Sequence, residues 1–163
     1  LIIRAYAEPT LLSPNLPYRI LVPLDGSHRA EQALMPAATF ANLLATPENP
    51  AAIVLLHVIS LSADDLNAAT DQIKQIRAAE MEAANRYLDE ILNKIQVSHV
   101  VKTADLASGD VAAAIVDYAT AHDVDLISMS SHGRSGVEQW VYGSVTEKVL
   151  RHAPCATLVT LSA

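Results

Sequence analysis

Residues 124–152 read VDLISMSSHGRSGVEQWVYGSVTEKVLRH, and this stretch decides the fold. Its first part, Val124–Ser130, is a mainly apolar run, which is typical of a strand covered on both faces. Its last part, Ser144–His152, has helical periodicity, and Ser144-x-x-Glu147 fits a capping box with Ser144 as the N-cap. A buried strand followed by a helix predicts a βα unit of a parallel sheet.

The same alternation of short apolar runs and longer helical segments fills the rest of the chain from Arg19 onward. We predict five strands, at Arg19–Leu24, Ala52–Ile59, His99–Leu106, Val124–Ser130 and Ala156–Leu161. Helices are predicted from about Ser27 to Leu44 with a kink at Pro36, and over Ile73–Ile95, Val111–His122 and Ser144–His152. The sequence therefore predicts an α/β fold with an open, mostly parallel five-stranded sheet and helices on both faces.

Composition argues against several function classes. The chain has 163 residues and a formal charge of −7, without a stripe of clustered Lys and Arg of the kind that nucleic-acid and acidic membrane surfaces require. No apolar run is long enough to span a bilayer. The single cysteine, Cys155, cannot form an internal disulfide and precedes an apolar strand, so we predict a buried thiol in a cytoplasmic protein.

The first 17 residues differ from the rest. Glu8–Pro17 contains three prolines and little periodicity, so residues 1–17 are predicted to be a linker or the tail of a preceding domain, with the folded domain at 18–163. Leu1-Ile2-Ile3-Arg4 is similar to Leu158-Val159-Thr160 near the other end. This similarity favours a tandem protein, and the alternative is a free extension.

Candidate binding residues follow the predicted strands, because ligands of open parallel sheets bind beyond the carboxyl ends of the strands. Asp25 can accept a hydrogen bond from a ribose hydroxyl or an adenine amino group, although it can equally cap the following helix. Val58 offers backbone groups and an apolar wall, and is otherwise an ordinary strand residue. Ser130 ends the fourth strand.

The segment after Ser130 has the features of an anion site. Glycines at 133, 136 and 143 allow backbone amides to approach an anion, and Gly143-Ser144 opens a helix whose positive end attracts phosphate. No glycine is followed by lysine, which excludes a P-loop, and the turn after the first strand lacks G-x-G-x-x-G. The histidines have no metal-ligand spacing, so no metal site made of side chains is predicted.

These motifs together resemble the universal stress proteins. The similarity is carried by Ile20–Ser27, by Leu55–Val58, and by Asp125–Gly136 continued through Gly143–Cys155. The ATP-binding members have the pattern G-x-x-G, nine residues, G-[ST]. This chain keeps Gly133, the spacer and Gly143-Ser144, but has Ser130 in place of the first glycine.

The resemblance implies a Rossmann-like fold of the adenine nucleotide alpha hydrolase type, with strand order 3-2-1-4-5, and a regulatory domain that binds ATP, ADP or AMP without dedicated catalysis. Mg²⁺ would be held through the phosphates. The resemblance also implies a homodimer or a tandem pseudo-dimer through the last strand, whose apolar edge favours pairing with another strand. The alternatives are a nucleotide-free dimerisation module and a slow ATPase. The predicted nucleotide contacts are Asp25, Val58, Ser130, His132, Gly133, Arg134, Gly143 and Ser144.

Overall fold

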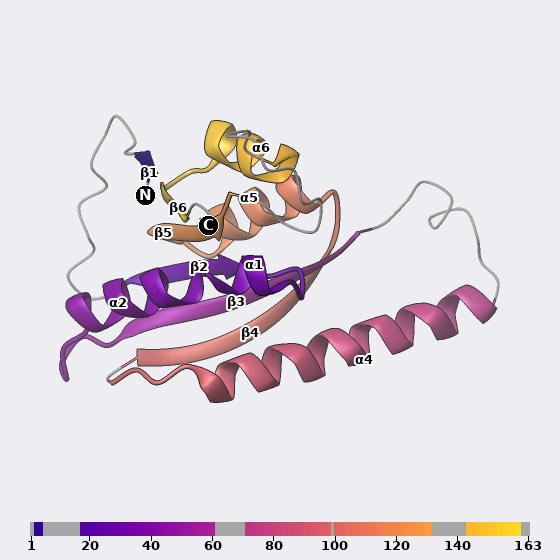
Figure 1. Cartoon of the computed structure of the whole chain (residues 1–163), viewed down its shortest axis with the longest axis horizontal. Coiled ribbons are helices and arrows are strands. Elements are labelled where there is room, and N and C mark those ends of the chain that lie inside the picture. The colour runs from indigo at the N-terminus through magenta and orange to yellow at the C-terminus, as the bar shows by residue number, and fades with distance from the viewer. Residues whose placement is uncertain (1, 5–16, 61–70, 99, 132–142, 161–163) are drawn as a thin grey trace.

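A computed structural model describes residues 2–4, 17–60, 71–98, 100–131 and 143–160 of the chain (Figure 1). Within these residues one sheet of six strands runs in the order β1-β6-β5-β2-β3-β4. The strands are β1 (Ile2–Arg4), β2 (Arg19–Pro23), β3 (Ala51–Ser60), β4 (Val100–Gly109), β5 (Leu126–Ser130) and β6 (Ala156–Thr160). All neighbouring strands are parallel except β1, which is antiparallel to β6.

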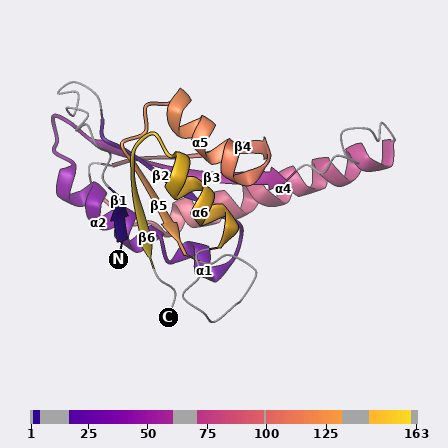
Figure 2. The ribbon, with the colours of Figure 1, turned by 90° about the horizontal axis from the view of Figure 1, so that it is seen from above.

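Helices cover both faces of the sheet, as predicted. They are α1 (His28–Glu31), α2 (Leu34–Leu44), α4 (Asp71–Lys94), α5 (Val111–Ala121) and α6 (Ser144–His152). Ile20 and Val22 of β2 pack in one buried cluster with α1, α2 and α4, whereas the intervening Leu21 packs in a second cluster with α5 and α6. Successive strand residues point to opposite faces, so a run that is apolar at every position fills two cores. Figure 2 shows α4 extending beyond the sheet at its N-terminal end.

The prediction of five strands is wrong, because the sheet has six, and its full order β1-β6-β5-β2-β3-β4 therefore differs from a five-strand order 3-2-1-4-5. The strands that the sequence identified follow one another as β4-β3-β2-β5-β6, and β1 is added beyond β6. Ile2, Ile3 and Arg4 pair with Val159, Leu158 and Thr157. A three-residue strand carries no detectable periodicity, so its pairing with a strand more than 150 residues away appears only in the tertiary structure.

The helix predicted over Ser27–Leu44 is divided into α1 and α2 at Gln32 and Ala33. The kink predicted at Pro36 is thus found as a break about one turn earlier, where a proline disturbs the carbonyl four residues before it. Pro36 lies in the first turn of α2, where a backbone N–H has no partner within the helix and its loss costs little. The carbonyl of Ala33 accepts a hydrogen bond of 2.9 Å from the buried hydroxyl of Ser128 on β5. This contact attaches the start of α2 to the centre of the sheet.

The connection from β4 to α5 depends on a glycine and a cap. Gly109 has φ of 127°, a conformation that other residues rarely adopt. Asp110 then caps α5 by accepting a hydrogen bond of 3.0 Å from the amide of Ala113. Among the residues that the structure describes, no helix is both long enough and apolar enough to cross a membrane.

Candidate functional site

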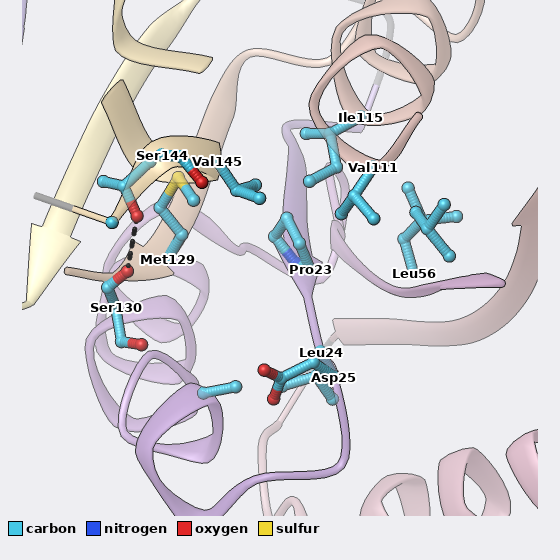
Figure 3. Close-up of a pocket in the computed structure, with 14 residues that line it drawn as sticks. Pro23, Leu24, Asp25, Leu56, Val111, Ile115, Met129, Ser130, Ser144 and Val145 are labelled. Atoms are coloured by element: carbon cyan, nitrogen blue, oxygen red, sulfur yellow. Dashed lines mark hydrogen bonds between the residues drawn. The ribbon is translucent and has the colours of Figure 1, made fainter. Parts of the chain in front are cut away.

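A cavity of about 270 Å³ lies at the carboxyl ends of β2, β3 and β5 (Figure 3). It is bounded by the N-terminal parts of α5, which follows β4, and of α6. Its lining is mostly apolar and includes Pro23, Leu24, Asp25, Ala30, Leu56, Val58, Val111, Ile115, Met129, Ser130, Gly143, Ser144, Val145 and Thr146. The place agrees with the rule that ligands of parallel sheets bind beyond the carboxyl strand ends.

A second, larger hollow of about 600 Å³ adjoins the first, since Asp25, Val58 and Val111 line both. It lies between the end of β3 and the middle of α4, and its polar lining residues include His57, Glu80 and Tyr87. The ring of His57 meets that of Tyr87 edge-on, with 6.4 Å between the centroids.

The second hollow has an acidic character, which the surroundings of Tyr87 illustrate. The hydroxyl of Tyr87 donates a hydrogen bond of 3.2 Å to Oε1 of Glu31 on α1. Burial, and then the negative charges of Glu31 and Asp25, raise the pKa of Tyr87 above its ordinary value. Glu80 on α4 also lines this hollow. Carboxylates on the α4 side therefore disfavour a phosphate group there, because they repel negative charge.

Asp25 uses one carboxylate oxygen to build the turn after β2. Its Oδ1 accepts a hydrogen bond of 2.9 Å from the amide of Ser27, and Gly26 between them has φ of 81°. The cap of α1 itself is Ser27, whose hydroxyl accepts from the amide of Ala30. Among the described residues, the Ser27 amide is the one hydrogen-bond donor to the Asp25 carboxylate, so Oδ2 accepts no hydrogen bond from this part of the chain.

Ser130 has the backbone conformation that suits a side chain. It ends β5 in register with Thr160 of β6 and is 7% exposed. Of the non-glycine residues described, only Asp123 has positive φ, so serine in place of glycine causes no left-handed strain here. The carbonyl of Ser130 accepts a hydrogen bond of 3.1 Å from the Thr146 hydroxyl, drawn as the dashed line in Figure 3.

The N-terminus of α6 forms the opposite wall of the cavity from Asp25 (Figure 3). Ser144 is the first helical residue and Gly143 is the N-cap, so the capping box with Ser144 as N-cap is wrong. Gly143 has no side chain to accept a hydrogen bond, and the first intrahelical bond runs from the amide of Glu147 to the Gly143 carbonyl at 2.9 Å. Among the described residues, no side chain therefore caps the amides of the first turn, which lie at the positive end of the helix dipole.

Backbone contacts fix this helix start against β5. The amide of Gly143 donates a hydrogen bond of 2.9 Å to the Ser131 carbonyl, and a Cβ at position 143 would lie 3.4 Å from that same oxygen. Thr146, buried in the first turn, donates its hydroxyl to the end of β5. The position of the α6 amides is thus set by the sheet.

Five of the eight predicted contact residues line the first cavity, namely Asp25, Val58, Ser130, Gly143 and Ser144. His132, Gly133 and Arg134 lie outside the described residues. The sequence analysis missed the walls contributed by Pro23, Leu56, Met129 and the first turn of α5. Their apolar character makes them indistinguishable from core residues in the sequence. The i, i+4 spacing of Val111 and Ile115 is the one available signal.

Two observations concern a metal site made of side chains and a reactive cysteine. Within the described ranges, no group of three or more His, Cys, Asp or Glu side chains is placed to hold a metal ion. Cys155 precedes β6 and does not line the cavity; burial, followed by the charge of Asp125, raises the pKa of its thiol to about 12. A thiol with so high a pKa is a poor nucleophile at neutral pH.

Comparison with known proteins agrees with this architecture. The model of the universal stress protein family matches residues 18–160. The chain belongs to the universal stress protein family. A Staphylococcus aureus (strain USA300) protein named "Putative universal stress protein" is 30% identical over 148 residues, which cover 86% of this chain and 81% of that protein. The solved structure of the hypothetical protein MJ0577 superimposes with a TM-score of 0.77 at 27% identity, over 90% of this chain and 96% of the other.

Two more distant structures of universal stress proteins share the fold and were determined with nucleotides. One, from Arabidopsis thaliana, has AMP bound and matches with a TM-score of 0.63 at 16% identity, covering 90% of this chain and 93% of the other. The second is a complex with cAMP and matches with a TM-score of 0.53 at 19% identity, covering 90% of this chain and 97% of the other.

Proposed function

We propose that this universal stress protein domain binds an adenine nucleotide, ATP or its products ADP and AMP, in the first cavity as a regulatory ligand. The observation that carries the proposal is that two opposite walls of the cavity differ in charge. One apolar hollow has a carboxylate at one wall and the uncapped N-terminus of α6 at the other. A nucleoside phosphate has hydroxyl and amino donors at one end and negative charge at the other, and so matches this arrangement.

The nucleoside end of the ligand is assigned to Asp25 and Val58. The second oxygen of Asp25 can accept a hydrogen bond from a ribose hydroxyl, while the first keeps the turn in place. Val58 at the end of β3 offers backbone groups to the adenine edge, and Met129 and Val111 offer apolar surface to its faces. The neighbouring second hollow gives the base room toward Tyr87.

The phosphate end is assigned to Gly143 and Ser144. The amides of the first turn, which no described side chain caps, and the hydroxyl of the exposed Ser144 are proposed as donors for phosphate oxygens. His132, Gly133 and Arg134 are proposed as further contacts, on the motif that they share with ATP-binding members. Mg²⁺ is proposed to be held through the phosphates, because that arrangement requires no cluster of carboxylate ligands from the protein.

A regulatory role is preferred to catalysis because of where the ionisable groups lie. Of the residues that the structure places around the first cavity, Asp25 is the one with an ionisable side chain, and it stands across the cavity from α6. General-base catalysis at the phosphates needs a base within hydrogen-bond reach of the attacking water. Any hydrolysis is therefore expected to be slow.

The nucleotide-free dimerisation module remains the second candidate. Its main support in the sequence is Ser130, which stands where the ATP-binding members have the first glycine of their pattern. The extended backbone of Ser130 removes that support, because serine is unstrained there. Mass spectrometry of the purified, denatured protein for co-purifying nucleotide, together with calorimetric titration with ATP and Mg²⁺, tests the proposal. Absence of both co-purified nucleotide and binding heat would lead to its withdrawal.

A further inference from the structure

The two edges of the sheet differ in a way that bears on assembly. At one edge β4 presents exposed charged residues, Lys102 and Asp105, and the Lys102 ammonium donates to the carbonyls of Leu92 and Ile95 at the end of α4. Charges of this kind are a common protection of edge strands against pairing with other chains. At the other end of the sheet, β6 lies next to the three-residue edge strand β1. Its sequence is Ala-Thr-Leu-Val-Thr, with neither charge nor proline.

The unprotected strand β6 is paired on its outer side with β1 of the same chain. The pairing is antiparallel and joins Ile2–Arg4 to Thr157–Val159, the central three of the five β6 residues. It is therefore the β1 segment that occupies the edge through which another strand would be added. Between β1 and β2 the chain carries Pro9, Pro14 and Pro17.

A second copy of this chain is the partner that fits the β6 edge. Two antiparallel β6 strands related by a two-fold axis at Leu158 would be self-complementary, as an isologous interface requires. Leu158 and Val159 are both fully buried and belong to opposite core clusters, so the helical layers on both faces of the sheet reach β6. A second copy would continue the sheet and both helical layers together.

We propose that β1 is an intramolecular competitor for this edge, so that two copies pair through β6 only when Ile2–Arg4 has left it. The inference is independent of nucleotide binding. Both copies must release β1 before they pair, so the apparent dissociation constant varies with the inverse square of the released fraction. A tenfold increase in that fraction lowers the dissociation constant about a hundredfold.

The test weakens β1 within the full chain. In an antiparallel pair, residues alternate between those that exchange hydrogen bonds with the partner and those that do not. Of the adjacent residues Ile2 and Ile3, one must therefore donate its amide to β6, and the double variant Ile2→Pro/Ile3→Pro removes that donor in either case. Ile2→Val/Ile3→Val is the matched control, since valine keeps both amides and a high strand propensity.

Sedimentation equilibrium over a range of protein concentrations, with far-UV circular dichroism as the check of folding, gives the result. We expect the proline variant to dimerise with a dissociation constant at least about tenfold lower than that of the wild type, and the valine variant to match the wild type. A peptide of residues 1–6, added in excess, should return the proline variant to monomer. Equal dissociation constants for all three proteins, or a folded proline variant that stays monomeric at hundreds of micromolar, would overturn the proposal.

If the proline variant does not fold, Ile2→Gly/Ile3→Gly replaces it. Glycine keeps the amides but disfavours the extended strand, so the same direction of change is expected with a smaller shift. An unchanged dissociation constant in a folded glycine variant whose β6 amides exchange faster with solvent would likewise overturn the proposal, because β1 would then leave the edge without promoting assembly.

Discussion

Replacement of Asp25 by alanine tests both the turn contact that the structure shows for this carboxylate and the ligand contact that we propose for it. Oδ1 accepts a hydrogen bond of 2.9 Å from the Ser27 amide. Oδ2 is proposed to accept one from the ligand. A hydrogen bond to a charged group contributes about 1.5–3 kcal/mol, and each 1.4 kcal/mol is a factor of about ten in affinity. We therefore expect Asp25→Ala to weaken binding of ATP with Mg²⁺ by at least about tenfold. Loss of the turn contact should lower the free energy of unfolding by about 1 kcal/mol.

The assay is calorimetric titration of the wild type and the variant, with denaturant unfolding of both. Ser27→Ala is the matched control, because it removes the cap of α1 and costs about 0.5–2 kcal/mol of stability without touching either hollow. It should leave affinity unchanged. An Asp25→Ala protein that binds within twofold of the wild type would refute the reasoning and reduce Asp25 to a turn residue. An equal loss of affinity in Ser27→Ala would show that the loss comes from disturbance of the turn.

Three further predictions follow from the backbone and the burial of single residues. Ser130→Gly should change nucleotide affinity by less than Asp25→Ala does, because Ser130 is already in extended backbone, and titration of both variants compares them. Clear binding by Ser130→Gly with none by the wild type would contradict this. Gly109→Ala should lower the free energy of unfolding by about 1 kcal/mol or more, because alanine is strained at the φ of 127° of this position. A steric clash does not contribute, since nothing lies within 4 Å of the added Cβ. Chemical denaturation measures the change, and an unchanged midpoint would contradict the prediction. The Cys155 thiol should react with iodoacetamide much more slowly in the folded protein than in urea from pH 7 to 9. Its pKa of about 12 keeps it protonated there, and equal rates would show that the burial is not maintained.

The sequence predicted the features of the fold that repeat along the chain. Runs such as Ile20–Leu24 are apolar at every position, and only a strand covered on both faces requires this. Together with the helical segments that alternate with these runs, that property predicted a central parallel sheet with helices on both sides. Asp25, Val58 and Gly143-Ser144 were also identifiable, because parallel strands place their carboxyl ends at one edge of the sheet.

The tertiary structure decided what depends on partners distant in the chain. The pairing of Ile2–Arg4 with β6 was not predicted. Three residues carry no pattern of their own, and which strand they pair with depends on the edges that the folded sheet presents. Gly143 became the cap of α6 because its amide is bound to the Ser131 carbonyl, although Ser144 has the better capping side chain. The apolar walls of the cavity were likewise hidden, because a side chain that faces a ligand and one that faces the core obey the same hydrophobic pattern in the sequence, and only the packing of α5 and α6 separates them.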